Sequence, residues 1–203
     1  GGNARIDGYV IDDDGNPVFD AQIEAWSYGD YDYNYDYYGY GNYYSVYGST
    51  DSAGYFNLPV LEGGWEVNTY NYHLIPDYMD TPNEYQEVTA FENDTVAVAN
   101  DFIIYKTDAT ISGNIYLDGA LYTDYSHISG YNGSWEWSDT TNTYTGTGYT
   151  YTETSDGSYS LSVASAGDDL GHWQYDWNWD DSTYTIDSTF ISGYEINMDI
   201  WEL

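Results

Sequence analysis

The sequence contains one pattern twice, with the two copies about 105 residues apart along the chain. The segment Ile6–Val10 returns as Ile111–Ile115, and a second match places Gly54 and Gly157 103 residues apart. Each copy has the length of one ordinary domain, and a repeat of this kind is the first feature that a fold must accommodate. We therefore predict two similar domains in series.

The periodicity of both copies is typical of β-strands. Apolar and polar side chains alternate along segments such as Ile6–Val10, as in a strand with one buried face, and helical periodicity is almost absent. Clusters of Gly, Asp, Asn and Pro separate these segments and predict turns. The chain is thus predicted to be all-β, with one β-sandwich over residues 1–106 and a second, degenerate copy over residues 107–203.

The same pattern predicts local structure. Strands at 6–10 and 21–25, joined by the turn Asp12–Pro17, have the signature of a β-hairpin, and Asp118-Gly119 predicts a tight turn. The stretch 194–203 alternates to its last residue. We expect it to be an edge strand whose free side pairs with a neighbouring copy, because an uncovered sheet edge is a site for strand addition.

The charge of the chain excludes several partners. Two Lys and Arg residues stand against 35 Asp and Glu, which gives a formal net charge of −33. Nucleic acids and anionic membrane surfaces bind the opposite sign of charge, and no apolar run is long enough for membrane insertion. Self-repulsion at this charge strains a folded chain, so we expect divalent cations to offset it.

Aromatic residues replace much of the usual Leu and Ile content, with 28 Tyr and 8 Trp. A Tyr/Asp/Gly-rich insertion spans 27–45, and it is either a solvated loop or a contact between subunits. Alternation in 173–180 puts aromatic rings on one face, which fits a sandwich core, a sugar-stacking platform or an intersubunit contact. The candidate aromatic interface comprises Tyr33, Tyr35, Tyr37, Trp173, Trp177 and Trp179.

Two oxygen-rich segments are candidate calcium sites. Ca²⁺ takes six to eight hard oxygen ligands, which carboxylates, amides and turn carbonyls supply. The alternative for each segment is a solvated acidic turn. The candidate ligands are Asp12, Asp13, Asp14, Asn16, Asp30 and Asp32.

The sequence contains few motifs for covalent modification or catalysis. Two sequons begin at Asn93 and Asn132, both in predicted turns where a glycan can be accommodated. The chain has no cysteine, and we find no catalytic motif among its three histidines and many carboxylates. The sequence therefore predicts a glycoprotein that is not an enzyme, with no catalytic residue to name.

The first copy resembles a known family. The pattern Ile6-x-Gly8-x-Val10-x-Asp12-x-x-Gly15-x-Pro17, followed by Thr50-Asp51-x-x-Gly54-x-Phe56-x-Leu58 and Gly64-Trp65-x-Val67, is similar to that of the carboxypeptidase regulatory-like domain. The second copy keeps Ile111-x-Gly113-x-Ile115 and Ser155-Asp156-Gly157 but lacks the proline. The resemblance implies an Ig-like, transthyretin-like β-sandwich in each copy. It also implies a non-catalytic accessory role in secreted and cell-surface proteins.

Two functional hypotheses follow from these features. The first is a structural subunit of an extracellular filament, sheath or surface layer that self-assembles through β-strand edges and aromatic contacts. Two accessory domains, a short junction at Thr107-Asp108 and abundant Tyr favour it. The alternative is a carbohydrate-binding or adhesion module of a larger secreted protein, whose partners would be glycans.

Overall fold

The computed structural model describes residues 2–27, 44–80, 85–137, 142–165, 173–176, 184–188 and 195–199. These residues form sixteen β-strands and one 3₁₀ turn, η1 (Tyr72–Leu74), with no α-helix among them. The prediction of an all-β fold is confirmed. In the part of the chain that the structure describes, no helix is long and apolar enough to cross a membrane.

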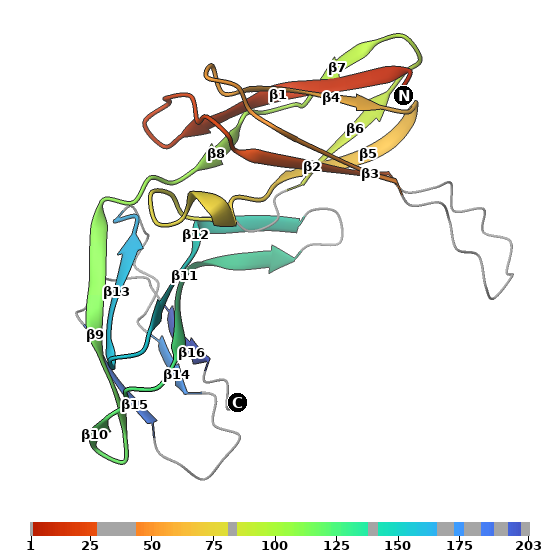
Figure 1. Ribbon diagram of the computed structural model, residues 1–203. Helices are drawn as coiled ribbons and strands as arrows, with labels where there is room; N and C mark the ends of the chain where they lie inside the picture. The colour runs from red at the N-terminus through yellow and green to blue at the C-terminus, as the bar shows by residue number, and fades with distance from the viewer. Residues whose placement is uncertain are drawn as a thin grey trace, which may run out of the picture. The chain divides into compact units, whose positions relative to one another are not determined.

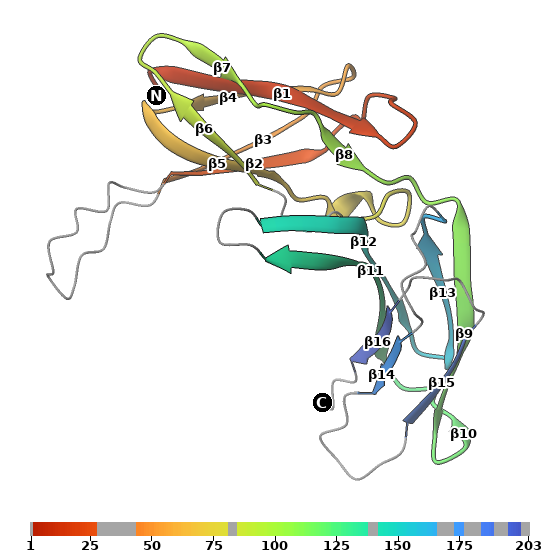
Figure 2. The ribbon, with the colours of Figure 1, turned by 180° about the vertical axis from the view of Figure 1, so that it is seen from behind.

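The strands divide into two compact units, each with two four-stranded sheets (Figures 1 and 2). Unit 1 comprises Gly1–Tyr70 and Asn83–Ile104, and unit 2 comprises Asn71–Pro82 and Tyr105–Leu203. The segment Asn71–Pro82 lies within the first copy of the sequence pattern, yet it belongs to the second unit.

The first strand of unit 1 lies at the centre of one sheet. β1 (Ala4–Asp12) pairs antiparallel with β4 (Tyr55–Val60) and parallel with β7 (Thr95–Ala97) and β8 (Phe102–Ile104). β7 and β8 follow one another along β1, because β7 pairs with its first half and β8 with its last residues. The sheet therefore ends in β4 on one side and in an interrupted strand on the other.

The second sheet of unit 1 is antiparallel throughout and has the order β3-β2-β5-β6. Its strands are β2 (Gln22–Ser27), β3 (Tyr44–Ser49), β5 (Gly63–Thr69) and β6 (Gln86–Ala90). Apolar side chains of the two sheets fill the space between them, as in a β-sandwich. The largest fully buried ones in this unit are Ile6, Ile23, Phe56, Leu58 and Ile104.

The predicted hairpin of strands 6–10 and 21–25 is wrong, since β1 and β2 lie in different sheets. The turn Asp12–Pro17 carries the chain from one sheet to the other. Both strands do alternate between buried and exposed residues as predicted. Alternation identifies the buried face of a strand, and it leaves the neighbouring strand undetermined.

Unit 2 also has two sheets. In one, β9 (Ala109–Leu117) pairs antiparallel with three strands: β10 (Ala120–Leu121), β13 (Ser158–Val163) and β15 (Tyr184–Ser188). The other sheet has the order β12-β11-β16-β14. Its strands are β11 (Ser126–Trp137), β12 (Asn142–Thr154), β14 (Trp173–Asp176) and β16 (Glu195–Asp199).

The repeat seen in the sequence is preserved in the pairing of strands. Ile6 lies opposite Leu58 in the β1–β4 pair, and Ile111 lies opposite Leu161 in the β9–β13 pair. Offsets of 105 residues in one strand and 103 in its partner thus keep the same register in both units.

In each unit, a turn that contains a glycine fixes this register. The N–H of Val10 donates to the Gly54 carbonyl at 2.8 Å, and the N–H of Ile115 donates to the Gly157 carbonyl at 2.8 Å. Both glycines have positive φ, 72° and 81°. A side-chain carbon on Gly54 would lie 2.5 Å from the carbonyl oxygen of Val10, so the turn requires glycine.

The two units differ in the placement of their last strands. β15 runs antiparallel to β9, whereas β7 and β8 run parallel to β1. β16 lies inside its sheet, antiparallel to β11 and parallel to β14. The predicted free edge at 194–203 is therefore wrong for the described residues, because Glu195–Met198 have partner strands on both sides.

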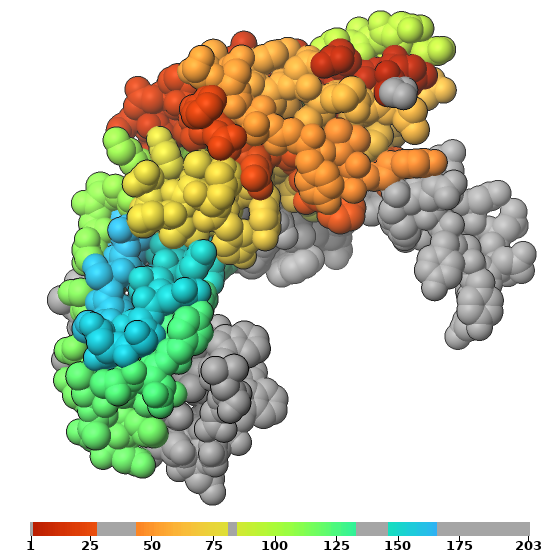
Figure 3. Space-filling model, in the orientation of Figure 1, coloured from red at the N-terminus to blue at the C-terminus, as the bar shows by residue number. Residues whose placement is uncertain are grey.

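The segment Asn71–Pro82 completes the core of unit 2. Met79 is fully buried in a cluster with Ile111, Ile115 and Ile128, and its N–H donates to the Tyr105 carbonyl at 2.8 Å. Asp80 and Tyr149 of β12 exchange two backbone hydrogen bonds of 2.7 Å each. Figure 3 shows the yellow atoms of this segment against the cyan atoms of β12.

Asp80 is buried with this segment, and 6% of the residue is exposed. Its Oδ1 accepts the N–H of Asn71 at 2.7 Å, which closes the segment on itself. Burial raises the pKa of the Asp80 carboxyl from 3.8 to about 6, and the Asn71 hydrogen bond and the charge of His73 oppose this shift. Between about pH 4 and pH 6, the folded chain therefore holds a proton here that the unfolded chain releases.

We predict that Met79→Ala lowers the free energy of unfolding of unit 2 by about 2–5 kcal/mol, the usual cost of emptying a fully buried site. Urea denaturation measures this change. Ile103→Ala, at a side chain of unit 1 that is 50% exposed, is the matched control and should change stability by about 0.5 kcal/mol or less. Equal effects of the two substitutions would contradict the placement of Met79 in the core.

We predict that Asp80→Asn stabilises the chain at pH 7.5 and has little effect near pH 4. A folded pKa above the unfolded one means that the contribution of Asp80 is greatest below about pH 4 and is lost as pH rises through 6. The amide is never charged, so it avoids a penalty of about 2–3 kcal/mol at neutral pH. Urea titrations of both proteins from pH 4 to 7.5 should diverge; parallel curves would contradict the assignment.

Candidate functional site

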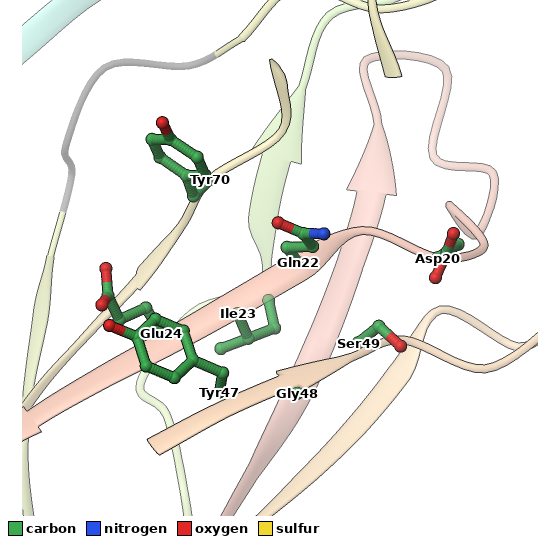
Figure 4. A pocket seen from close by; sticks show the side chains of 8 residues that line it. All are labelled: Asp20, Gln22, Ile23, Glu24, Tyr47, Gly48, Ser49 and Tyr70. Carbon is green, nitrogen blue, oxygen red and sulfur yellow. The ribbon is translucent and has the colours of Figure 1, made fainter. Parts of the chain in front are cut away.

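A hollow of about 610 Å³ opens on the outer face of the β3-β2-β5-β6 sheet of unit 1 (Figure 4). We call it the Tyr47–Tyr70 hollow. A site of this size accepts a ligand of several rings, since pockets of about 300–1,000 Å³ hold drug-sized molecules. Its lining comprises Asp20, Gln22, Ile23, Glu24, Tyr47, Gly48, Ser49 and Tyr70.

Strand register brings the lining residues together. In the β2–β3 pair, Gln22 lies opposite Ser49 and Glu24 lies opposite Tyr47. The N–H of Tyr70, just after β5, donates to the Gln22 carbonyl at 3.0 Å, so β2 holds both tyrosines in place. Because side chains alternate between faces, the residues on either side of the buried Ile23 project outward.

The chemistry of the hollow combines aromatic walls with hydrogen-bond acceptors. Tyr47 is 67% exposed and Tyr70 is 49% exposed. Figure 4 shows Tyr47 beside Glu24, and Tyr70 on the other side of β2. Carboxylates at two lining positions and the absence of Lys or Arg from the lining make the site negative. It can therefore accept hydrogen bonds from a ligand and contact its apolar faces, and it repels anions.

A second feature of this sheet is its edge strand β3. Among the described residues of unit 1, β3 pairs with β2 alone. Its exposed aromatic residues are Tyr44 at 47% and Tyr47 at 67%, and Figure 3 shows the orange atoms of this region at the surface. Residues 37–50 carry no Asp, Glu, Lys or Arg, which is unusual in so acidic a chain.

The other edges of unit 1 carry features that discourage pairing. β4 contains Pro59, which has no N–H to donate, and β6 contains the charged Glu87. The edge made of β7 and β8 is interrupted between them. Proline, charge and irregularity are the usual protections of sheet edges, and β3 has none of the three.

The predicted calcium turn is present, and its first aspartate holds the turn together. Asp12 is 3% exposed, and its Oδ1 accepts the N–H groups of Asp14 at 3.1 Å and Asn16 at 2.7 Å. The Asn16 side-chain amide donates to Asp12 Oδ2 at 3.1 Å. In the described part of the chain, no three His, Asp or Glu side chains group as a metal site. Calcium binding at Asp12, Asp13, Asp14 and Asn16 stays a prediction.

Several predicted site residues lie outside the described residues. These are Asp30, Asp32, Tyr33, Tyr35, Tyr37, Trp177 and Trp179. Trp173 begins β14, next to β16, where the structure describes the backbone.

The two sequons have different surroundings. Asn93 is exposed in the turn between β6 and β7 with φ of 61°, so the prediction of a turn there is confirmed. Asn132 lies within β11 and is 1% exposed, and its Oδ1 accepts the N–H of Thr147 at 3.3 Å. The prediction of a turn at Asn132 is wrong, because the Gly-rich run around it is accommodated by a β-bulge in the β11–β12 pair.

Sequence reasoning did not identify Tyr47 and Tyr70 as partners. They are 23 positions apart, and each belongs to an alternating segment that resembles many others in this chain. Their proximity follows only from strand pairing, because β3 and β5 both pair with β2.

Comparison with known proteins gives β-rich similarities only. No protein-family model matches the sequence, and no curated protein matches it. The structure of a streptococcal ancillary pilin is similar with a TM-score of 0.37 and 10% identity, covering 79% of this chain and 58% of that chain. The Bacillus anthracis TIE protein gives a TM-score of 0.37 and 10% identity, covering 96% of this chain and 43% of that one.

A DUF3823 family protein from Bacteroides ovatus gives a TM-score of 0.31 and 11% identity, covering 79% of this chain and 97% of that one. This chain spans 58% and 43% of the length of the pilin and the TIE protein. Likeness at these TM-scores carries no functional argument, so the function proposed below rests on the geometry of the chain.

We predict that Asp12→Ala lowers the free energy of unfolding by about 1–3 kcal/mol, because the partly buried hydrogen bonds from the Asp14 and Asn16 N–H groups lose their charged acceptor. Thermal or urea denaturation with 2 mM CaCl₂ and with EDTA, at fixed ionic strength, separates the two roles of the residue. An equal loss in both buffers identifies a turn-holding role. A loss confined to the calcium buffer identifies Asp12 as a ligand. Asp101→Ala, at an exposed carboxylate outside this turn, is the control.

Proposed function

We propose that this chain is a structural subunit of an extracellular filament, sheath or surface layer, and that copies join through the free edge of β3. The observation that carries the proposal is an edge strand with no charge, no proline and no interruption in a chain of net charge −33. Such an edge is a ready template for main-chain pairing with a second copy. Pairing of β3 with β3 joins two copies, and a polymer requires a second contact elsewhere on the chain.

The direction of the β3 backbone groups supports this edge as the contact. The N–H of Thr50 donates to the Ala21 carbonyl at 3.0 Å, toward β2. Since N–H groups alternate in direction along a strand, those of Ser45, Tyr47 and Ser49 point away from β2, toward the free side. On that side, a neighbouring strand can accept hydrogen bonds from these three N–H groups and donate to the carbonyls of the same three residues.

Electrostatics supports the same place of contact. Copies of net charge −33 repel one another over most of their surface, and the repulsion is strongest where carboxylates meet. Residues 37–50 bring no carboxylate to the contact. The exposed rings of Tyr44 and Tyr47 add apolar area beside the backbone bonds, as aromatic residues commonly do at interfaces.

The sequence resemblance supports an extracellular location for this structural role. The first copy resembles the carboxypeptidase regulatory-like domain, which implies an accessory, non-catalytic role in secreted and surface proteins. Divalent cations remain part of the proposal as counter-ions that lower repulsion between copies. A polymer of this kind has its own chain as its principal partner and no nucleic acid.

We predict that Ser45→Pro prevents self-assembly and leaves the fold intact. Proline removes an N–H that points to the free side, so no bond of the β2–β3 pair is lost. Ser45→Thr keeps the N–H and the β-propensity, and it is the matched control. Sedimentation velocity and negative-stain microscopy in CaCl₂ should show polymers for the wild type and Ser45→Thr, and loss of these polymers for Ser45→Pro.

Circular dichroism and thermal unfolding confirm that the proline variant is folded. Polymers of Ser45→Pro like those of the wild type would show that β3 is not the contact. A wild-type chain that stays monomeric at millimolar concentration with calcium would contradict the structural role itself.

A further inference from the structure

We infer that the Tyr47–Tyr70 hollow is a binding site for a neutral saccharide of two or more rings. The inference goes beyond the structural role and does not depend on it, since the hollow lies on the face of the sheet and within one chain. The size of the hollow, its aromatic walls, its acceptor groups and its charge all favour such a ligand.

The size of the hollow favours a ligand of several rings over a single ion or ammonium group. At about 610 Å³ it lies in the middle of the range of pockets that hold drug-sized ligands. An ammonium group bound by aromatic rings needs those rings within about 6 Å of the charge, in a close cage. A hollow of this volume, open on an exposed sheet, is broader than such a cage.

The two tyrosine rings supply surfaces that suit sugar rings. The face of an aromatic ring is electron-rich, and the C–H bonds on one face of a pyranose carry partial positive charge, so the two lie flat against each other. Tyr47 and Tyr70 are 67% and 49% exposed; Tyr47 is on β3 and Tyr70 directly follows β5, and these two strands flank β2. Exposed rings that are held by strand pairing lose little entropy on contact with a ligand.

The polar side chains of the lining can all accept hydrogen bonds, and the carboxylates of Asp20 and Glu24 can only accept. Glu24 lies opposite Tyr47 and Gln22 lies opposite Ser49 in the β2–β3 pair, and Asp20 lies at one end of the hollow (Figure 4). A saccharide presents a hydroxyl donor at nearly every carbon, and hydrogen bonds from hydroxyl groups to carboxylates are short and strong. Acceptors at several positions therefore fit a ligand that donates repeatedly along its length.

Charge decides that the saccharide is neutral. The lining contains two carboxylates and no cationic side chain, and the chain as a whole carries −33. Uronic acids, sulfated sugars and phosphates would meet repulsion with nothing to neutralise them. A second copy of this chain offers only Arg5 and Lys106 as cations, so a cationic partner would have to come from another molecule.

Affinity electrophoresis of the full chain, in native gels containing amylose, mannan, galactan or a mixed-linkage β-glucan, tests the inference. We expect at least one neutral polymer to slow the wild type. Tyr47→Ala and Tyr70→Ala should each abolish the retardation. Tyr9→Ala, on β1 of the other sheet at 46% exposure, is the matched control and should be slowed like the wild type.

Calorimetry with the trisaccharide of the retarding polymer then measures the loss, which we expect to be tenfold or more for each hollow variant. Tyr70 lies beside β5 and away from the β3 edge, so the polymers of Tyr70→Ala should persist, and failure of this inference is distinguishable from failure of the structural role. Retardation by no polymer, or equal retardation of all four proteins, would overturn it. Binding of spermidine that disappears in 0.5 M NaCl, without saccharide binding, would overturn it in favour of a cationic ligand.

Discussion

Repulsion among 35 carboxylates constrains where this chain can be buried and where it can touch another molecule. In the described residues, the buried acidic side chains are Asp12 and Asp80, and each accepts N–H groups from its own segment. The core between the sheets is otherwise apolar or weakly polar. Charge is thus kept on outer faces and turns, and the stretches without charge are the ones free to approach a neighbour.

In the second unit, the segment Asn71–Pro82 covers the edge of the sheet at β12. Asp80 exchanges backbone hydrogen bonds with Tyr149 at the edge of β12, and Tyr72 adds its ring at 5.7 Å from that of Tyr149. Side chains of Thr147 and Thr150 are buried in the same stretch. β3 occupies the corresponding edge of unit 1, and in the described residues no such segment covers it. The contrast favours β3 as an edge left open for a partner.

The sequence predicted the faces of the strands well and their neighbours poorly. Alternation marks buried positions such as Ile6 and Ile111, and the paired offsets of 105 and 103 residues anticipate one shared register. The same alternation assigned β1 and β2 to one hairpin, because a period of two carries no information about the partner strand. Met79 gave no sequence signal, since one apolar residue in a Pro-containing loop does not reveal which core it enters. The hollow was missed for a related reason: its walls meet only once β2 has paired on both sides.

The proposed subunit contact at the edge of the β3-β2-β5-β6 sheet involves main-chain groups, whereas the proposed saccharide site on its face involves side chains. Main-chain N–H groups of β3 lie in the plane of the sheet, while the Tyr47 side chain stands perpendicular to it. A copy added at β3 therefore extends the sheet without displacing the ring, and each added copy brings its own hollow. Sites with modest individual affinity, repeated along a polymer, bind a long polysaccharide far more tightly than one site does, because every binding event after the first is intramolecular. Assembly and saccharide binding would then reinforce each other on one surface.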